Sequence, residues 1–362
     1  MANDGVGCEA GGTPLSPGHK QVTGPSAHLG HDPARRAEDD QSQGPQASSR
    51  AQSSGAGRSD TLGSCMNDFS TVTTARALQV ACAEVGLDAS GAELLRLGEN
   101  AMYRLHHDPV VVRIARTRAY LPDVEKEVAV ARWLDSVGVP AVRLTKHSRQ
   151  PLLVADTVIT FWEFVPESTA PATVGDLARL LRQLHSLPVP DGVPLQPLDP
   201  FHRIPERIRG ARGIHSDDRA MLWDRYEDLN DRYHTVQFEL PTAVIHGDAN
   251  IGNVIHHIDG RVLLLDFDNF AIGPPEWDLT LTATYYSNFR WHSEAEYRQF
   301  SDVYGYDVMQ LPGYPVLRDL RELHMLSWLV QNVAENARVA AEFRKRVATI
   351  RNGIMPRGWE PF

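Results

Sequence analysis

The stretch from residue 243 to residue 268 places polar side chains at the ends of two short apolar runs. The first run leads into a loop that contains Asp248 and Asn253, and the second run, residues 262–265, ends directly on Asp266. An Asp-Gly pair lies between the two runs, and this pair is a strong signal for a tight hairpin turn. Two strands that return on each other in this way would bring Asp248, Asn253 and Asp266 to neighbouring strand ends.

Side chains of these types in one place suit phosphoryl transfer. That reaction needs little covalent help from a protein. It needs a carboxylate that holds the attacking hydroxyl, and hard oxygen ligands for the metal ion that neutralises the phosphates. Asp248 suits the first task, and Asn253 and Asp266 suit the second.

Residues 1–65 differ in composition from the rest of the chain. They are rich in Gly, Ser, Ala, Pro and Gln, and the first sixty contain no Phe, Trp, Tyr or Ile. Such a segment cannot bury enough apolar surface to offset the entropy of ordering it, so we predict a disordered tail. Met66 stands where ordinary globular composition begins. A start site assigned too far upstream and a genuine disordered extension both explain this pattern.

Residues 66–165 predict a small lobe built on an antiparallel sheet. A helix from residue 73 ends at Gly86, and three short apolar runs with tight turns follow it over residues 94–114. A helix from Pro122 to Gly138 comes next. Residues 152–154 and 158–161 then complete a sheet of about five strands.

Residues 166–362 predict a larger and mostly helical lobe. Thr173 and Asp176 form a capping-box pattern before an apolar helical stripe. A helix is expected over about residues 217–236, and the chain beyond Trp277 has a helical pattern almost to its end, in which Ser293 caps a segment that ends at Gly305. The fold class is therefore predicted to be α+β, with two lobes.

Charge and cysteine usage exclude several classes of protein. The formal net charge is −10 and the isoelectric point is near 5.8, which argues against a nucleic-acid binder because such proteins usually show a basic footprint. No apolar run approaches the ~18–20 residues that span a bilayer. The three cysteines, Cys8, Cys65 and Cys82, form no CxxC pair, so we expect a reducing cytoplasm rather than a disulfide framework.

The motif His246-x-Asp248-x4-Asn253, followed by an apolar strand and Asp266, resembles the catalytic and metal-binding loops of aminoglycoside phosphotransferases. That family shares the protein-kinase fold. The resemblance implies that Asp248 is the catalytic base or hydroxyl-orienting group, and that Asn253 and Asp266 bind Mg²⁺. It also implies that His246 structures the loop. Pro275-Glu276-Trp277-Asp278-Leu279 is similar to the motif that follows the metal loop in the family, and this likeness makes Asp278 a buried support of the catalytic loop.

The first lobe is similar to the nucleotide-binding lobe of the same family. Gly98 and Asn100 lie in a segment that resembles the turn near the phosphates. Arg113 stands on the strand from which kinases extend a cation to the α- and β-phosphates, and Glu127 on the next helix would pair with it. Arginine in place of lysine keeps the charge and adds a planar fork of donors. The resemblance further implies that the linker residues hold the adenine of ATP or GTP: Trp162, Glu163, Phe164 and Val165.

Several interpretations stay open on the sequence alone. Asp268 could be a second metal ligand, a substrate contact or a solvated carboxylate. His256 and His257 could suggest a metal site but fit a position near the hairpin turn better. A set of acidic residues could favour a polycationic substrate: Glu276, Glu294, Glu296, Asp302 and Asp307.

The acceptor is expected to be a hydroxyl of a small molecule, such as an aminoglycoside, another antibiotic, an amino alcohol or a sugar. A metal-dependent phosphohydrolase built on His246, Asp248, Asp266, Asp268 and His256 is an alternative, and so is a catalytically silent pseudokinase. Neither the choice between ATP and GTP nor the oligomeric state follows from the sequence.

Overall fold

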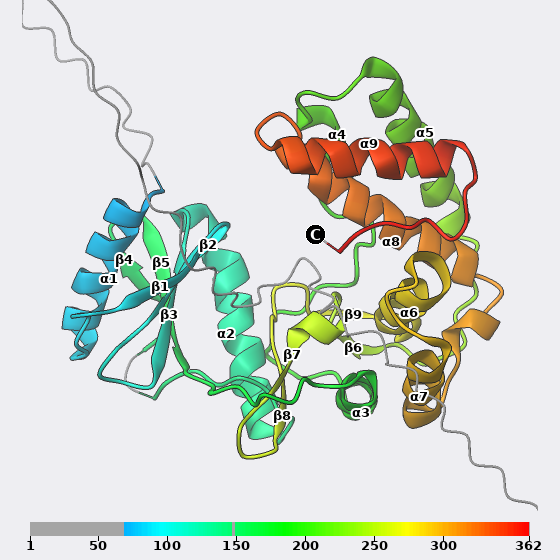
Figure 1. Ribbon diagram of the computed structural model, residues 1–362. Coiled ribbons are helices and arrows are strands. Elements are labelled where there is room, and N and C mark those ends of the chain that lie inside the picture. The colour runs from blue at the N-terminus through cyan, green and yellow to red at the C-terminus, as the bar shows by residue number, and fades with distance from the viewer. Residues whose placement is uncertain (1–68, 147–148, 362) are drawn as a thin grey trace, which may run out of the picture.

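A computed structural model describes residues 69–146 and 149–361. The predicted tail over residues 1–65, with Cys8 and Cys65, lies outside the described residues, and so does Met66. The first part of the described chain is a five-stranded antiparallel sheet in the order β1-β2-β3-β5-β4, shown at the left of Figure 1. Its strands are β1 (Glu93–Leu97), β2 (Asn100–Arg104), β3 (Val110–Ala115), β4 (Leu152–Val154) and β5 (Thr157–Glu163).

Two α-helices accompany this sheet. Helix α1 (Thr71–Val85) starts with a capping box between Ser70 and Thr73, and it ends at Gly86, whose positive φ of 75° gives the left-handed C-cap that favours glycine. Its buried face, which includes Leu78 and Cys82, joins the inner residues of the sheet in one apolar cluster. A 3₁₀ turn (Arg118–Tyr120) precedes α2 (Leu121–Ser136), which carries a proline in its first turn, as expected for a helix start.

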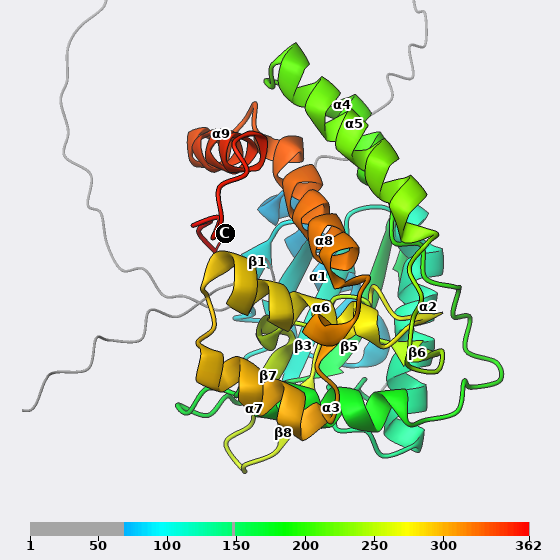
Figure 2. The same cartoon turned by 90° about the vertical axis from the view of Figure 1, so that its right-hand side faces the viewer.

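The second part of the chain is mainly helical, and Figure 2 shows its long helices from the side. The predicted helix starts at Thr173 and Ser293 are confirmed, because both residues form capping boxes. The α-helices are α3 (Val174–His185), α4 (Ile204–Gly210), α5 (Ser216–Tyr233), α6 (Glu276–Thr284), α7 (Glu294–Tyr304), α8 (Tyr314–Leu329) and α9 (Ala337–Arg351). The shorter helical turns are η2 (Ile251–Asn253), η3 (Tyr285–Phe289), η4 (Val308–Gln310) and η5 (Val330–Asn332), of which η3 is a π-helix.

Two short antiparallel pairs lie within the helical part. Strand β6 (Ala243–Ile245) pairs with β9 (Ala271–Gly273), and β7 (Val254–His256) pairs with β8 (Val262–Leu264) in the hairpin that the sequence predicts. The hairpin also contacts the segment after α2, because Val142 N donates to Leu264 O at 3.0 Å and Leu264 N donates to Pro140 O at 3.0 Å. The buried ends of these strands therefore hold their polar loops between the sheet and the helices.

Among the residues that the structure describes, no helix is both long enough and apolar enough to cross a membrane.

Candidate active site

The loop between β6 and η2 is fixed by backbone conformation and by its own side chains. Gly247 has a φ of +84°, and a Cβ atom at this position would lie 2.1 Å from Asn269 O, so only glycine fits this turn. The Asn250 side chain accepts a hydrogen bond from Gly252 N at 2.8 Å and caps the 3₁₀ turn that ends at Asn253. Asp248 thus protrudes from a loop whose two ends are both constrained.

Asp248 and Asn253 are in direct contact, as their spacing predicts. Asn253 Nδ2 donates to Asp248 O at 2.8 Å and lies 3.5 Å from Asp248 Oδ2. Because the amide nitrogen is used in this way, the amide oxygen of Asn253 is the atom left for a cation. Asn253 is buried, and Asp248 is partly exposed.

His246 holds the loop to the neighbouring strand, which supports its predicted structural role. Its Nε2 lies 2.8 Å from Leu265 O, and its Nδ1 accepts from Asp248 N at 3.3 Å. A carbonyl oxygen can only accept and a backbone N–H can only donate, so a neutral imidazole with its proton on Nε2 satisfies both partners. The buried ring therefore connects the backbone of Asp248 to the residue just before Asp266.

Asp278 on α6 is fully buried, and it holds the loop that carries Asp248. Its two carboxylate oxygens accept hydrogen bonds from His246 N at 2.7 Å and from Gly247 N at 2.8 Å. His185 Nε2 on α3 lies 3.0 Å from the same carboxylate. Burial alone would raise the pKa of the Asp278 carboxyl, but the hydrogen bond and charge of His185, together with the His246 backbone, lower it overall.

Two further residues support the loop that carries Asp248, and neither was expected from the sequence. Arg321 on α8 donates to Gly247 O at 3.0 Å and to Trp277 O at 2.8 Å, and its guanidinium lies 3.8 Å from the centre of the Trp277 ring. Its burial lowers its pKa to about 10. His185 is the second residue. Neither stands in a motif, and only their contacts with residues far away in the sequence reveal them.

Asp266 lies two residues after the end of β8 and has a φ of +61°, an uncommon backbone conformation for a residue other than glycine. Leu265 N donates to Asn253 O at 2.9 Å, so the residue before Asp266 is bonded to the end of the loop that carries Asp248. Burial and the charges of Asp268 and Asp248 raise the pKa of Asp266 to about 6 despite the opposing effect of Arg113. The carboxylate of Asp266 and the amide oxygen of Asn253 are hard oxygen donors of the kind that suits a divalent cation such as Mg²⁺.

Arg113 on β3 is held by three side chains. Its Nη1 donates to Glu127 on α2, and its Nη2 donates to both oxygens of Asp268 at 3.1 and 3.0 Å. When the Asn100 amide oxygen faces Arg113, it accepts from Nε at 3.1 Å and from Nη2 at 2.8 Å. Burial raises the pKa of Glu127. Burial alone would lower the pKa of Arg113, but the charges of Glu127 and Asp268 raise it overall. The sequence-predicted pair of Arg113 and Glu127 is therefore present, with Asp268 as an additional partner.

The other predicted nucleotide-binding residues lie at the β1–β2 turn, at the end of β5 and directly after it. Gly98 is in the turn, where its N–H donates to Asn100 O at 3.0 Å. The Trp162 ring lies 5.9 Å from the ring of Phe267, which follows Asp266. The chain from Glu163 to Val165 leaves the sheet. The Arg104 guanidinium lies 4.0 Å from the centre of the Phe164 ring.

Glu276, His256 and His257 have contacts of a structural kind. Glu276 is fully buried, and its Oε1 accepts from the backbone N–H groups of Glu239 and Leu240. His256 Nδ1 lies 3.1 Å from Ala170 O, and His257 lies beside Asp259 in the hairpin turn. Within the described part of the chain, no group of three or more His, Cys, Asp or Glu residues is arranged to hold a metal ion. The contact of His256 with Ala170 O weakens the phosphohydrolase alternative, which uses His256.

Residues 92–320 match the family model of the phosphotransferase enzyme family. The chain belongs to this family. Its fold is similar to that of an amicoumacin kinase in complex with AMP-PNP and Ca²⁺, with 15% identity, a TM-score of 0.58, and coverage of 79% of this chain and 96% of that one.

Two further solved structures share the fold of this phosphotransferase. A spectinomycin phosphotransferase in complex with ADP and spectinomycin has 15% identity and a TM-score of 0.56, with coverage of 78% of this chain and 95% of that one. A choline kinase from Streptococcus pneumoniae has 14% identity and a TM-score of 0.53, with coverage of 76% and 99%. No curated protein matches the chain by sequence. The likeness to these three solved structures confirms the protein-kinase-like fold that the sequence predicts.

Proposed function

We propose that this phosphotransferase moves the γ-phosphoryl group of ATP or GTP to a hydroxyl of a small molecule with the help of Mg²⁺. The observation that carries the proposal is the contact of Asp248 with Asn253 beside the end of the strand that bears Asp266. Membership of the phosphotransferase family supports it. The acceptor candidates are an aminoglycoside or other antibiotic and, as an alternative, a metabolic amino alcohol or sugar.

Each residue has a role that its position permits. Asp248 accepts the proton of the acceptor hydroxyl or orients that hydroxyl. The hydroxyl oxygen forms a bond to the γ-phosphorus, and the bond between the γ-phosphorus and the β-phosphate oxygen breaks. Asn253 and Asp266 would hold Mg²⁺, which neutralises phosphate charge when it is bound. Arg113, positioned by Glu127, would contact the phosphates.

The nucleotide lobe in this proposal comprises residues 66–165, and the catalytic lobe comprises residues 166–362. Gly98 and Asn100 would approach the phosphates from the β1–β2 turn, and the segment from Trp162 through Glu163 and Phe164 to Val165 would border the adenine. Because the donor is ATP or GTP, we place the reaction in the cytoplasm.

The deciding experiment incubates the protein with labelled ATP or GTP and a panel of hydroxylated antibiotics and metabolites. Asp248→Asn keeps the size of the side chain but cannot take a proton, so we expect loss of transfer by a factor of about 10³ or more with nucleotide binding retained. Product formation without any nucleotide would instead indicate the phosphohydrolase. Nucleotide binding without transfer to any acceptor, and without slow hydrolysis that depends on Asp248, would indicate the pseudokinase.

A further inference from the structure

We infer that the acceptor of this phosphotransferase carries at most one positive charge and is not a polycation. This inference rests on the proposed function, since it concerns the acceptor side of the same site. It follows from three features of the helical lobe: which turn lies beside Asp248, what covers that turn, and how the nearby carboxylates are paired.

The π-helical turn η3 lies beside the catalytic loop. It continues directly from α6, and α6 is joined to the loop because Trp277 Nε1 donates to Gly247 O at 3.0 Å. Tyr285, the first residue of the turn, lies within electrostatic reach of Asp248, whose charge adds to the effect of burial in raising the pKa of the phenol. The helical lobe thus borders Asp248 through this turn, on the side that leads away from Arg113 and the sheet.

The chain after α9 covers the same turn. Arg357 N donates to Asn288 O at 2.8 Å, and Trp291 Nε1 donates to Trp359 O at 2.8 Å. The rings of Phe289 and Trp359 are stacked with centres 4.8 Å apart. Charged groups and rings therefore lie next to this turn, on the side of Asp248 where the acceptor would bind. They belong to residues 357–359 and to the residues of α8 and α9 that contact them.

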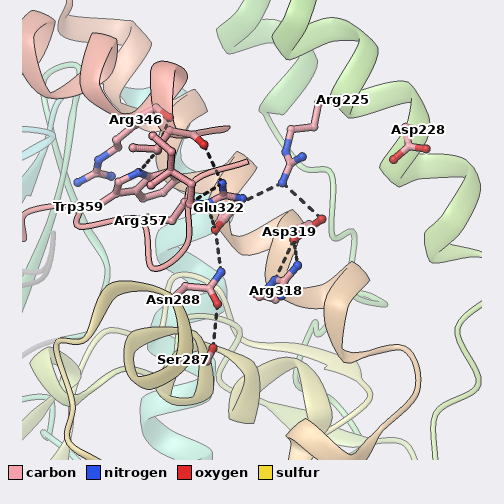
Figure 3. A network of polar contacts seen from close by, with 12 residues as sticks. Arg225, Asp228, Ser287, Asn288, Arg318, Asp319, Glu322, Arg346, Arg357 and Trp359 are labelled. Atoms are coloured by element: carbon pink, nitrogen blue, oxygen red, sulfur yellow. Dashed lines mark hydrogen bonds and ion pairs between the residues drawn. The ribbon is translucent and has the colours of Figure 1, made fainter. Parts of the chain in front are cut away.

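Arginines neutralise the carboxylates in this region, as Figure 3 shows. The fully buried Glu322 on α8 accepts from Arg357 Nε at 2.8 Å and Nη2 at 3.0 Å, and from Arg225 Nη2 at 3.1 Å. Asn288 Nδ2 donates to the same carboxylate at 2.8 Å, which ties it to the π-turn. Every strong acceptor site of Glu322 is therefore engaged within the protein.

The neighbouring acids are paired in the same way. Asp319 lies 2.7 Å from Arg318 and 3.5 Å from Arg225. On α9, Glu342 accepts from Arg346 Nε at 2.8 Å, and the same guanidinium lies over the Trp359 ring. A polyamine that used one of these carboxylates would have to displace an arginine and leave it buried without its partner, which is strongly unfavourable.

Four of the five acidic residues that could have favoured a polycation are also engaged within the protein, and the fifth, Asp302, is exposed on α7. Glu276 is buried against backbone N–H groups, and Asp307 accepts from Tyr297 Oη at 2.5 Å and from Met309 N at 3.0 Å. Glu294 pairs with Arg298 on the surface of α7, and Glu296 forms the capping box with Ser293. Those four acidic side chains thus stabilise the helical lobe, and a polycation that used one of them would have to break the contact it already makes.

A matched pair of ligands tests the charge requirement directly. Kanamycin is a polyamine, and its fully N-acetylated derivative keeps the hydroxyls without the positive charges. Binding of each to the nucleotide-loaded protein is measured by calorimetry at low and high salt, because attraction between exposed charges weakens as salt is added. We expect kanamycin to bind no more tightly than the neutral derivative and to show little salt dependence.

Variants in the arginine network sharpen the test. Arg225→Gln removes one partner of Glu322 and of Asp319, so we expect it to increase kanamycin affinity by about threefold or more. The control Arg232→Gln lies on the same helix and breaks only the exposed pair with Asp228. If Arg225→Gln does not fold, Arg318→Gln replaces it.

Preferential, salt-sensitive binding or phosphorylation of kanamycin by the unaltered protein would overturn the inference, and so would equal kanamycin affinity of Arg225→Gln and Arg232→Gln. Failure of the proposed function gives a different result, namely no metal-dependent binding of ATP or GTP in the absence of any acceptor. The two failures are therefore separable in one set of titrations.

Discussion

Replacement of Asp278 by Asn removes the charge beneath the catalytic loop with almost no change in size. The carboxylate accepts hydrogen bonds from His246 N, Gly247 N and His185 Nε2 at 2.7–3.0 Å. An amide offers a single acceptor oxygen, so if that oxygen keeps the His246 and His185 contacts, the amide nitrogen faces Gly247 N as donor against donor.

The expected loss follows from these contacts. A hydrogen bond to a charged group contributes about 1.5–3 kcal/mol, and a buried donor left without a partner costs about 1–3 kcal/mol. We therefore expect Asp278→Asn to lower the free energy of unfolding by about 2–4 kcal/mol. Displacement of Asp248 by about 1 Å would lower kcat by about a hundredfold, while the nucleotide Kd stays within about twofold.

The pH dependence of stability adds a second readout. The folded-state pKa of Asp278 lies below its ordinary value, so its stabilising contribution is present above about pH 4 and is lost as the pH falls through the folded-state pKa. The difference in unfolding free energy between the unaltered protein and Asp278→Asn should therefore shrink as the pH drops below about 4.

Urea unfolding and a coupled assay of nucleotide turnover measure both effects. Asp302→Asn, on the exposed surface of α7, is the control for loss of one negative charge and should change the unfolding free energy by less than about 0.5 kcal/mol. The reasoning is refuted if Asp278→Asn is as stable and as active as this control.

Three other substitutions have defined outcomes. Gly247→Ala should destabilise the protein by about 2–4 kcal/mol in urea unfolding because of the clash with Asn269 O, whereas Gly86→Ala, with open space around its Cβ, should cost only about 1–2 kcal/mol; equal losses would contradict the clash. Asp266→Asn should abolish the Mg²⁺ dependence of nucleotide binding in titrations with and without chelator, and unchanged dependence would exclude Asp266 as a metal ligand. Arg113→Lys keeps the charge but not the fork that joins Glu127 to Asp268, so it should raise the nucleotide KM by about tenfold in steady-state kinetics; an unchanged KM would argue against a phosphate role.

The local signals in the sequence were sufficient for most of the framework. The capping boxes at Thr173 and Ser293 and the glycine stop at Gly86 depend on contacts within a few residues, so their patterns are visible in the chain itself. The hairpin β7–β8 is similarly local, and it alone brings Asp266 close to Asn253.

The support of the site could not be predicted in this way, because it depends on packing between distant segments. Arg321 is one of several charged residues of α8, and the sequence does not reveal that its guanidinium reaches Gly247 O. His185 likewise ends an ordinary amphipathic helix. The sequence does not decide the role of Asp268 for the same reason, since its partner Arg113 lies 155 residues earlier in the chain.

The contacts of Asp268 join the two lobes at the site. Its carboxylate binds Arg113 on β3, and its backbone oxygen accepts from Lys126 Nζ on α2 at 2.5 Å. Asp248 is held through Asp278 from the helical lobe. Asp266 is tied to the same loop, because Leu265 before it is bonded to Asn253 and to His246. A change in the angle between the lobes would therefore move Arg113 relative to both aspartates, and the alignment of phosphate with metal and hydroxyl would require the lobe arrangement that the Asp268 contacts stabilise.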